Sequence, residues 1–278
     1  MIEDSSPEPS STLRRFGPLP GCNEPGILRY PWLKPALAVA PAEGWCCQCM
    51  DDNAAPWDEA VAAFVLLESE WKVWVHLPHD AARRRWMRGR VAAKDAIRLL
   101  LLDRYGVAAP LETISVLPDQ RGQPQVSCAA VSKTGAGIAI SISHCGNSSV
   151  ALASDRSGGC LGVGIDVASQ TDNHDGLEEG GFASTEMALL HDCPATERAD
   201  WLLRLWCAKE AVSKALGVGL RGNPLHYLVR RIDRARGTAD VEAHLETTIL
   251  PQGLVRLTAT VGCDRGLAFA VAHRGDSK

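Results

Sequence analysis

The sequence has no apolar run long enough to cross a membrane, since its longest runs, such as residues 61–67, fall well short of the ~20 residues that a spanning helix needs. Residues 1–4 are acidic and lack the basic-then-apolar order of a signal peptide. The net charge of -4 excludes a global attraction to nucleic acid or to an anionic membrane. We therefore expect a cytoplasmic protein that binds neither nucleic acid nor a membrane.

The chain also lacks a disulfide or zinc framework, although it contains 10 cysteines. Most of them are scattered, and a reducing cytoplasm would keep them as thiols. The one cluster, Cys46, Cys47 and Cys49, is followed by no second cysteine or histidine pair at zinc spacing. Free thiols in a variable segment are the simpler interpretation.

What the sequence does have is the composition of a globular protein, with 278 residues of which 46% are hydrophobic and 22% charged. This length suits one large domain or two modest ones. Residues 1–55 are expected to form an irregular N-terminal extension, because most of them lie in a stretch rich in Pro, Gly, Ser and Ala without periodicity. Residues 60–77 are apolar and strand-like, and residues 80–105 form a predicted helix between Asp80 as a candidate cap and Gly106.

Residues 137–144 alternate with the period of a strand that buries one face. Three isoleucines point one way, while Ala139, Ser141 and Ser143 point the other way. The strand ends at His144, beside small polar residues. A lone histidine is more often structural than functional, but this position would allow it to donate to a phosphate.

A second strand is predicted over residues 160–168, where apolar side chains share one face. The opposite face carries Gly162, Gly164 and Asp166, so little side-chain bulk crowds the carboxylate and a ligand could approach it closely. A helix is expected from about residue 196 to residue 216, ended by Gly217.

Short alternating strands follow over residues 241–271. The order strand, helix, strands thus occurs twice, around residues 60–155 and 160–273. We predict an α+β fold of two similar subdomains in a pseudo-two-fold arrangement, spanning residues 56–157 and 158–278.

The second predicted helix carries Glu210 and Lys214 at a spacing of four residues. Alone, this spacing indicates an ordinary surface ion pair worth about 0.2–0.5 kcal/mol. With Lys209 adjacent and Asp166 earlier in the chain, the two carboxylates and two lysines suit a magnesium-bridged pyrophosphate. Magnesium prefers carboxylate and phosphate oxygens and keeps several of its waters.

The first predicted helix is unusually basic near its start, where the helix dipole disfavours cations. Its cationic residues are Arg83, Arg84, Arg85, Arg88, Arg90, Lys94 and Arg98. A solvated basic face and a nucleic-acid site are alternatives. A compact polyphosphate ligand explains cations placed against the dipole better than a long backbone does.

In this order, Ser-Ile-Ser-His at 141–144, Gly-Ile-Asp at 164–166 and Trp-Cys-Ala-Lys-Glu-Ala-Val-Ser-Lys at 206–214 resemble the 4′-phosphopantetheinyl transferases of the surfactin-synthetase (Sfp) type. The basic segment 85–90 fits an upstream arginine motif of that family. The resemblance spans about residues 80–220.

The resemblance implies an enzyme that transfers 4′-phosphopantetheine from coenzyme A to a serine of an apo acyl or peptidyl carrier protein, releasing 3′,5′-ADP. It also implies the fold of that family, with the active site between the subdomains, and a dependence on Mg²⁺. Asp166 and Glu210 would hold the metal, and Glu210 is the candidate base. The implied catalytic residues are Asp166, Glu210 and Lys214, and the implied coenzyme A contacts are Arg85, Arg90, Ser143, His144, Asp166, Lys209 and Lys214. Lys209 has the alternative role of supporting the helix alone.

Two positions depart from the family pattern. Ala168 stands where many relatives have a second acid, so we predict that water completes the metal shell. Gln123 stands where relatives often have a lysine, which leaves that coenzyme A contact open.

The carrier would belong to a polyketide, fatty-acid or nonribosomal peptide synthase, and the enzyme is expected to be a monomer. Because carrier proteins are typically acidic, the predicted carrier contacts are Leu220, Arg221, Arg230 and Arg231. Two other functions stay open, namely a catalytically inactive coenzyme A-binding module and a nucleic-acid binder. The presence of Asp166, Glu210 and Lys214 argues against the inactive module.

Overall fold

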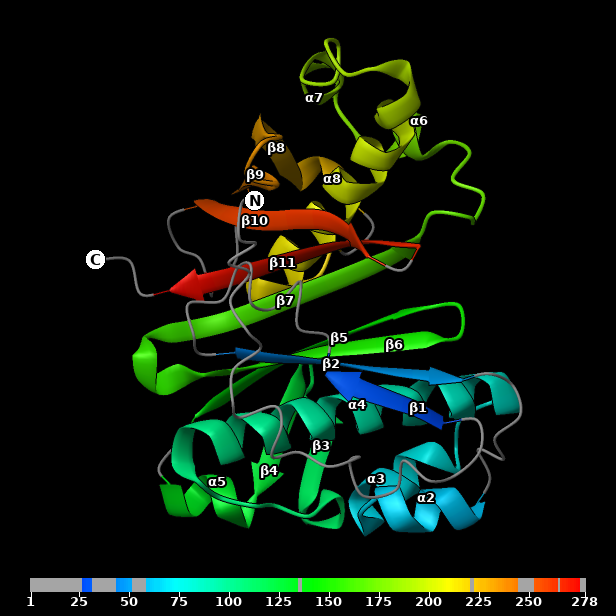
Figure 1. Ribbon diagram of the computed structural model, residues 1–278, viewed down its shortest axis with the longest axis vertical. Helices are drawn as coiled ribbons and strands as arrows, with labels where there is room; N and C mark the ends of the chain where they lie inside the picture. Colours follow the sequence, from blue (N-terminus) through cyan, green and yellow to red (C-terminus); the bar gives the residue numbers. More distant parts are fainter. Residues whose placement is uncertain are drawn as a thin grey trace, which may run out of the picture.

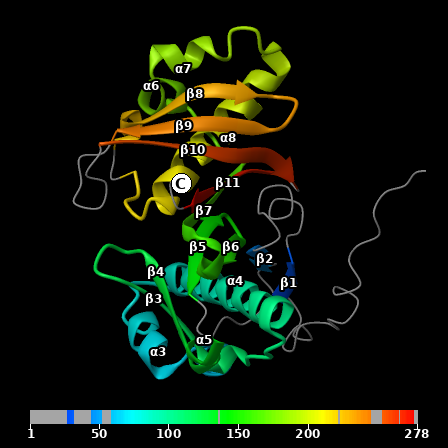
Figure 2. The ribbon, with the colours of Figure 1, turned by 90° about the vertical axis from the view of Figure 1, so that its left-hand side faces the viewer.

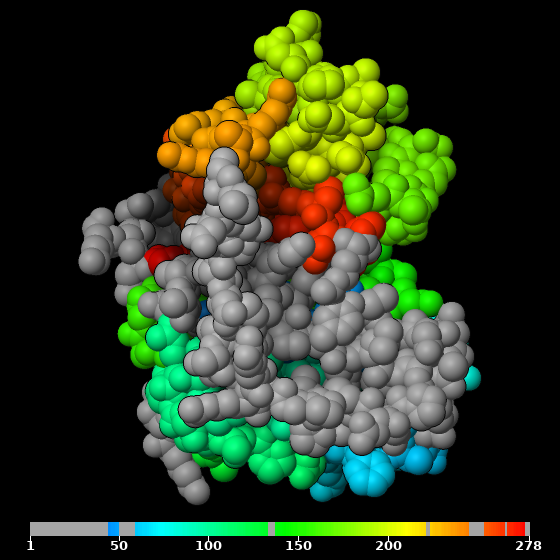
Figure 3. Space-filling view, in the orientation of Figure 1, coloured from blue at the N-terminus to red at the C-terminus, as the bar shows by residue number. Residues whose placement is uncertain are grey.

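The computed structural model describes residues 27–31, 44–51, 59–134, 137–220, 223–244, 253–264 and 266–275. Helices and strands are mixed, which confirms the α+β class, and they form two halves stacked along the long axis (Figure 1). In each half a long helix packs against an antiparallel sheet. The space-filling view shows the C-terminal half as the upper part of the molecule and the helices of the N-terminal half at its base (Figure 3).

The N-terminal half is built on a sheet with the strand order β1-β2-β6-β5. Figure 2 shows its long helix, α4, lying below β5 and β6, with the β3–β4 hairpin to one side. The elements are β1 (Ile27–Pro31), β2 (Gly44–Asp51), α2 (Glu59–Val65), α3 (Glu68–Trp74), α4 (Asp80–Tyr105), η2 (Leu111–Thr113), β3 (Ile114–Pro118), β4 (Pro124–Cys128), α5 (Ala129–Thr134), β5 (Ile138–Cys145) and β6 (Ser148–Asp155).

The C-terminal half has the strand order β7-β11-β10-β9-β8, with α8 packed on one face. Its elements are η3 (Arg156–Gly158), β7 (Cys160–Ser169), α6 (Leu177–Gly181), α7 (Ser184–Ala188), α8 (Ala195–Ala215), η4 (Pro224–His226), β8 (Tyr227–Asp233), β9 (Thr238–His244), β10 (Leu254–Asp264) and β11 (Leu267–Gly275). Within the described ranges, no helix combines the length and the apolar character that crossing a membrane requires.

Both long helices end at the glycines predicted from the sequence. Gly106 follows α4 with φ 62°, and Gly217 follows the cap of α8 with φ 71°, a conformation that glycine adopts without steric cost. At the start of α4, the side chain of His79 accepts a hydrogen bond from the amide of Ala82. The cap is therefore His79, one residue before the predicted Asp80.

The two halves repeat the same strand arrangement. In each, a strand from the start of the half pairs with its last strand, β2 with β6 and β7 with β11. The last strand then pairs with the one before it in a hairpin, β5 with β6 and β10 with β11. This correspondence agrees with the predicted pseudo-two-fold arrangement.

Each half also contains a buried ion pair between a lysine of its long helix and a glutamate, which is a second similarity between the halves. Lys94 on α4 and Lys209 on α8 are fully buried, and their ammonium groups lie 2.6 Å from Glu70 and 2.8 Å from Glu186. Each glutamate also accepts hydrogen bonds from two backbone amides, those of Leu67 and Val116 for Glu70 and those of Ala183 and Val229 for Glu186. Buried charges are tolerated when they are paired and hydrogen-bonded in this way.

The strand predicted within residues 60–77 is wrong. This segment forms α2 and α3, which pack near α4. A short continuous apolar run does not show the alternation that separates a strand from a buried helix.

The predicted irregular extension, residues 1–55, also differs from the structure in that it contains β1 and β2. The side chains of Cys47 and Cys49 on β2 are buried toward α4, whereas Cys46 is buried on the opposite face, toward the C-terminal half. Because β2 is buried on both faces, it lacks the polar alternation by which a half-exposed strand is recognised. β2 is therefore an inner strand of the N-terminal sheet, between β1 and β6.

The alternation predicted for β5 is confirmed. Ile138 and Ile140 are buried against α4, while Ser141 and Ser143 face β7 of the other half. The two sheets meet here along an apolar interface that includes Ala139 of β5 and Ile165 of β7.

The glycines of β7 face α8 and not a ligand, which corrects the interpretation from the sequence. A Cβ atom at Gly164 would lie 1.8 Å from the carbonyl oxygen of Ala211, and one at Gly162 would lie 2.2 Å from that of Ala215. The missing side chains allow the helix backbone to approach the strand backbone directly.

Replacing Gly164 by alanine is expected to lower the free energy of unfolding by about 3 kcal/mol or more, because the new methyl group must push α8 away from β7. Gly180→Ala is the control, since a Cβ there meets nothing within 4 Å. Urea unfolding of both variants measures the effect. Equal stability of the Gly164 variant and the wild type would contradict the close packing.

Candidate active site

The three predicted catalytic residues lie where α8 packs on β7, beside the edge strand β5. Nζ of Lys214 lies 2.7 Å from Oδ1 of Asp166 and donates to the carbonyl oxygen of Ile165 at 3.0 Å. From the other half, Oγ of Ser143 donates to the same Oδ1 of Asp166 at 2.7 Å. The side chain of Asp166 is only 11% exposed, so these contacts hold a nearly buried carboxylate.

Glu210 stands one helical turn before Lys214 and is half-buried. Burial raises the pKa of the Glu210 carboxyl, the negative charge of Asp166 raises it further, and Lys214 lowers it. The negative charge of Asp166 is therefore close enough to disfavour ionisation of Glu210. A cation bound beside them would relieve this repulsion.

This donor set fits a hard divalent cation such as Mg²⁺, which takes oxygen ligands and retains waters. Ala168 lies on the same face of β7 as Asp166, packs against the core of the C-terminal half and offers no donor. In the part of the chain that the structure describes, no three His, Cys, Asp or Glu side chains gather as a metal site. Asp166 and Glu210 stay the predicted protein ligands.

His144 lies at the end of β5 with its ring against α4. A Cβ at Gly89 would lie 2.5 Å from the Cε1 of His144, so the helix leaves room for the ring only because residue 89 is glycine. Nδ1 of His144 shares a 2.7 Å hydrogen bond with Oγ of Ser149. Burial, together with the nearby cations, lowers the pKa of His144 to about 3.

The cations that act on His144 are Arg85, Lys214, Arg90 and Arg88. Arg85 is exposed, whereas Arg88 is 5% exposed and donates to the carbonyl oxygen of Gly146 at 3.1 Å. Positive charge gathered around a neutral ring favours a multiply charged anion. Arg88 was missed from the sequence, although its position one turn after Arg85 places it on the same side of the helix.

Arg90 is directed into the N-terminal half. Its guanidinium lies 4.2 Å from the centre of the Trp86 ring, and burial lowers its pKa to about 10 while Glu70 raises it. Arg90, Lys94 and Arg98 therefore do not form a solvated basic stripe, because Arg90 and Lys94 are buried. This burial disfavours the nucleic-acid alternative.

The side chain of Lys209 is fully buried in the protein interior. Its ammonium donates to the carboxylate of Glu186, to the carbonyl oxygen of Gly181 at 2.7 Å and to that of Pro224 at 3.5 Å. With no exposed surface, it cannot reach a substrate phosphate without unfolding this network. Of the two roles open from the sequence, support of the helix is the one that the geometry favours.

The β3–β4 turn reaches across to the end of α8. A Cβ at Gly217 would lie 2.9 Å from Oε1 of Gln123, and Figure 2 shows this hairpin loop beside the segment that follows α8. The position that is often a lysine in relatives is therefore near Lys214, but here it supplies an uncharged amide.

The predicted carrier contacts that the structure describes are buried or lie on the outer face of the sheet. Leu220 is 9% exposed within the core, and Arg221 lies outside the described residues. Arg230 lies 2.6 Å from Glu242, which also pairs with Arg256, and these contacts lower the pKa of Glu242 to about 2. These charges occupy the face of the sheet opposite α8, because their neighbours on β9, such as Val241, are the residues buried against α8.

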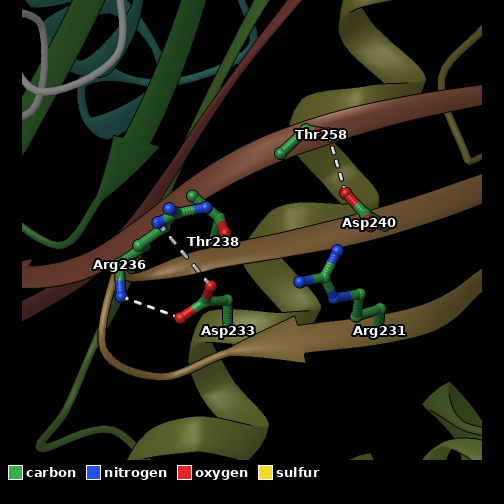
Figure 4. A pocket seen from close by; sticks show the side chains of 6 residues that line it. All are labelled: Arg231, Asp233, Arg236, Thr238, Asp240 and Thr258. Carbon is green, nitrogen blue, oxygen red and sulfur yellow. Dashed lines mark hydrogen bonds and ion pairs between the residues drawn. The ribbon is translucent and has the colours of Figure 1, made fainter.

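Arg231 lies on the same outer face and lines a pocket of about 270 Å³ (Figure 4). The side chains of the pocket lie in front of the strands, and α8 passes behind them. Its acids already have partners, since Asp240 accepts from Thr258 and Asp233 accepts from the amide of Arg236. The pocket therefore contains neither a predicted catalytic residue nor a predicted metal ligand.

Two carboxylates and an ammonium group thus lie beside arginines and a neutral histidine, an arrangement that suits metal-assisted transfer of a phosphoryl group. Residues 162–253 match the family model described as the 4′-phosphopantetheinyl transferase superfamily. The matched segment contains Asp166, Glu210 and Lys214, and it covers about a third of the 278 residues. It supports an enzyme of the phosphopantetheinyl transferase class.

Among solved structures, the holo-acyl-carrier-protein synthase of Helicobacter pylori in complex with coenzyme A is similar at 15% identity and a TM-score of 0.30, over 47% of this chain and 97% of that chain. The corresponding synthase of Neisseria meningitidis is similar at 16% identity and a TM-score of 0.31, over 47% and 96%. No curated protein matches the sequence.

Replacing either buried lysine by methionine should lower the free energy of unfolding by about 3–5 kcal/mol, because a glutamate is left buried without its partner. Chemical denaturation of Lys94→Met and Lys209→Met measures the two losses of stability. The losses should be similar, because each lysine pairs with one buried glutamate. If Lys209 instead served coenzyme A, its variant would keep wild-type stability and lose coenzyme A affinity. That result would contradict the supporting role.

His144 should stay neutral from pH 8 down to about pH 5, because its pKa in the folded protein is about 3. At pH values between this pKa and the pKa of about 6.5 in the unfolded state, the unfolded protein binds more protons than the folded protein. His144 therefore contributes stability that is full above the unfolded pKa and is lost as the pH falls toward the folded one. NMR chemical shifts of the imidazole test this, and a titration midpoint near 6.5 would refute it.

Proposed function

We propose that the protein is a 4′-phosphopantetheinyl transferase of the Sfp type, which modifies a serine of an apo carrier protein with phosphopantetheine from coenzyme A. The contact of Ser143 with Asp166, which also pairs with Lys214, carries this proposal. It joins the acidic centre on β7 and α8 to the arginine and histidine cluster on α4 and β5. A metal site and an anion site then lie side by side, as the pyrophosphate and the 3′-phosphate of one coenzyme A require.

In this function, Arg85, Arg88 and His144 bind the 3′-phosphate of coenzyme A. Arg88 replaces Arg90 as the direct contact, because the guanidinium of Arg90 stacks on Trp86. Asp166 and Glu210 would hold Mg²⁺, which when bound neutralises charge on the pyrophosphate. Lys214 adds a fixed positive charge beside Asp166.

The reaction forms a bond between the carrier serine oxygen and the phosphorus that bears pantetheine. The bond from that phosphorus to the bridging oxygen breaks, and 3′,5′-ADP leaves with the bridging oxygen. Glu210 accepts the serine proton and later releases it to solvent. Burial and the charge of Asp166 raise the pKa of Glu210 in the metal-free protein, and a bound cation would lower it again.

An acidic carrier protein of a polyketide, fatty-acid or peptide synthase is the proposed partner. Its serine must reach Glu210 on α8, whereas Arg230 and Arg231 lie on the opposite face of the sheet. We therefore leave these two arginines and the buried Leu220 out of the proposed carrier surface.

Incubation with coenzyme A, Mg²⁺ and apo carrier proteins of each synthase class is expected to raise the mass of a carrier by one phosphopantetheine. Glu210→Ala should reduce the rate by about 10²–10⁴-fold, the usual contribution of a general base. Glu197→Ala is the control, because Glu197 is an exposed acid at the start of the same helix. Intact mass spectrometry over time gives both rates.

Coenzyme A binding without any transfer to the carriers would instead favour the inactive binding module. Transfer that is equally fast in the Glu210 and Glu197 variants would contradict the role of Glu210 as base. Either outcome can be read from the same mass spectra together with a coenzyme A titration.

A further inference from the structure

Two serines of β5 bridge the edges of the two sheets. Oγ of Ser141 accepts a hydrogen bond from the amide of Ile165 at 3.1 Å, and Oγ of Ser143 accepts one from the amide of Val167 at 3.3 Å. Both serines are buried, at 3% and 5% exposure. They satisfy backbone amides of β7 that have no strand partner on this side in the described sheet, whose order begins with β7.

The two serines differ in one contact. The hydroxyl of Ser143 also donates to Oδ1 of Asp166 at 2.7 Å, whereas Ser141 is bonded to the backbone of β7. A serine hydroxyl has a single proton to donate. That proton is already given to Asp166, so Ser143 has none left for a phosphate of coenzyme A.

Asp166 is thereby held from both halves of the molecule. Lys214 of α8 approaches the same Oδ1 at 2.7 Å, from the C-terminal half. Two donors on one oxygen restrict rotation of the carboxylate and determine which oxygen is presented to a ligand. Ser143 is the hydrogen-bond donor that the N-terminal half contributes to this restraint.

We infer that Ser143 is a positioning residue for Asp166, which lets the N-terminal half control the metal affinity of an acid on the C-terminal half. This inference rests on the proposed function, in which Asp166 is a metal ligand. It replaces the expectation that Ser143 contacts coenzyme A. Hydrogen-bond partners of metal-ligating carboxylates typically contribute about 10–100-fold to metal affinity.

The test measures binding of Mn²⁺, which shares the oxygen ligands of Mg²⁺, by electron paramagnetic resonance on the full chain without coenzyme A or carrier. Ser143→Ala is expected to weaken Mn²⁺ binding by about 10–100-fold. Ser141→Ala is the matched control, because it removes the same kind of strand contact without touching Asp166. Its Mn²⁺ affinity should stay near that of the wild type.

Ser143→Thr retains the hydroxyl and should restore binding. Ser143→Cys nearly retains the side-chain volume but has a weak donor, so it tests the same contact if the alanine variant fails to fold. Thermal unfolding of each variant establishes that it is folded. Wild-type affinity in the alanine or cysteine variant would overturn the inference, and so would an equal loss in Ser141→Ala.

The outcome is separable from that of the proposed function. A wild type that transfers phosphopantetheine while Ser143→Ala binds Mn²⁺ normally would refute the positioning role alone. A wild type whose Mn²⁺ affinity depends on Ser143 but that modifies no carrier would refute the transferase alone. Absence of Mn²⁺ binding by the wild type would overturn the positioning of a metal ligand.

Discussion

The contact between α8 and β7 is the constraint on which the rest of the site depends. Gly162 and Gly164 leave no side chain between the helix backbone and the strand backbone, so the two approach directly. At this short distance Lys214 reaches both Asp166 and the carbonyl oxygen of Ile165. Glu210, one turn earlier, then stands close enough to Asp166 for its pKa to be raised. Glycine in a strand usually weakens packing, but here it allows the acids and the ammonium group to meet.

The site is shared between two halves of similar design. Each half holds its long helix with a buried lysine and glutamate pair, and the C-terminal lysine of this kind, Lys209, directly precedes Glu210. The acids lie on the C-terminal half, whereas His144 and the arginines lie on the N-terminal half. A pyrophosphate and a further phosphate on one ligand would require both halves, which gives a physical reason for an active site at their junction.

Several elements were predictable because their signals are local. Gly106 and Gly217 end helices through the left-handed conformation that glycine allows, and β5 alternates because one of its faces is apolar. The segments 60–77 and 44–51 were not predictable in this way. The first is a pair of short helices with no clear period, and the second is a strand buried on both faces. In both cases contacts with the rest of the protein determine the secondary structure, and these contacts leave no periodic pattern in the local sequence.

The sequence by itself predicted the chemistry of the site, because Asp166, Glu210 and Lys214 stand in apolar segments that unpaired charges avoid and occur together in motifs that resemble one transferase family. Only the tertiary structure decided which neighbouring residues take part. Lys209 and Arg90 were predicted to contact coenzyme A, yet one is buried against Glu186 and the other lies over Trp86. Arg88 is among the cations that lower the pKa of His144, and the hydroxyl of Ser143 donates to Asp166. These roles depend on which way a side chain points from its helix or strand and on what packs there, and contacts between residues far apart in the chain determine both.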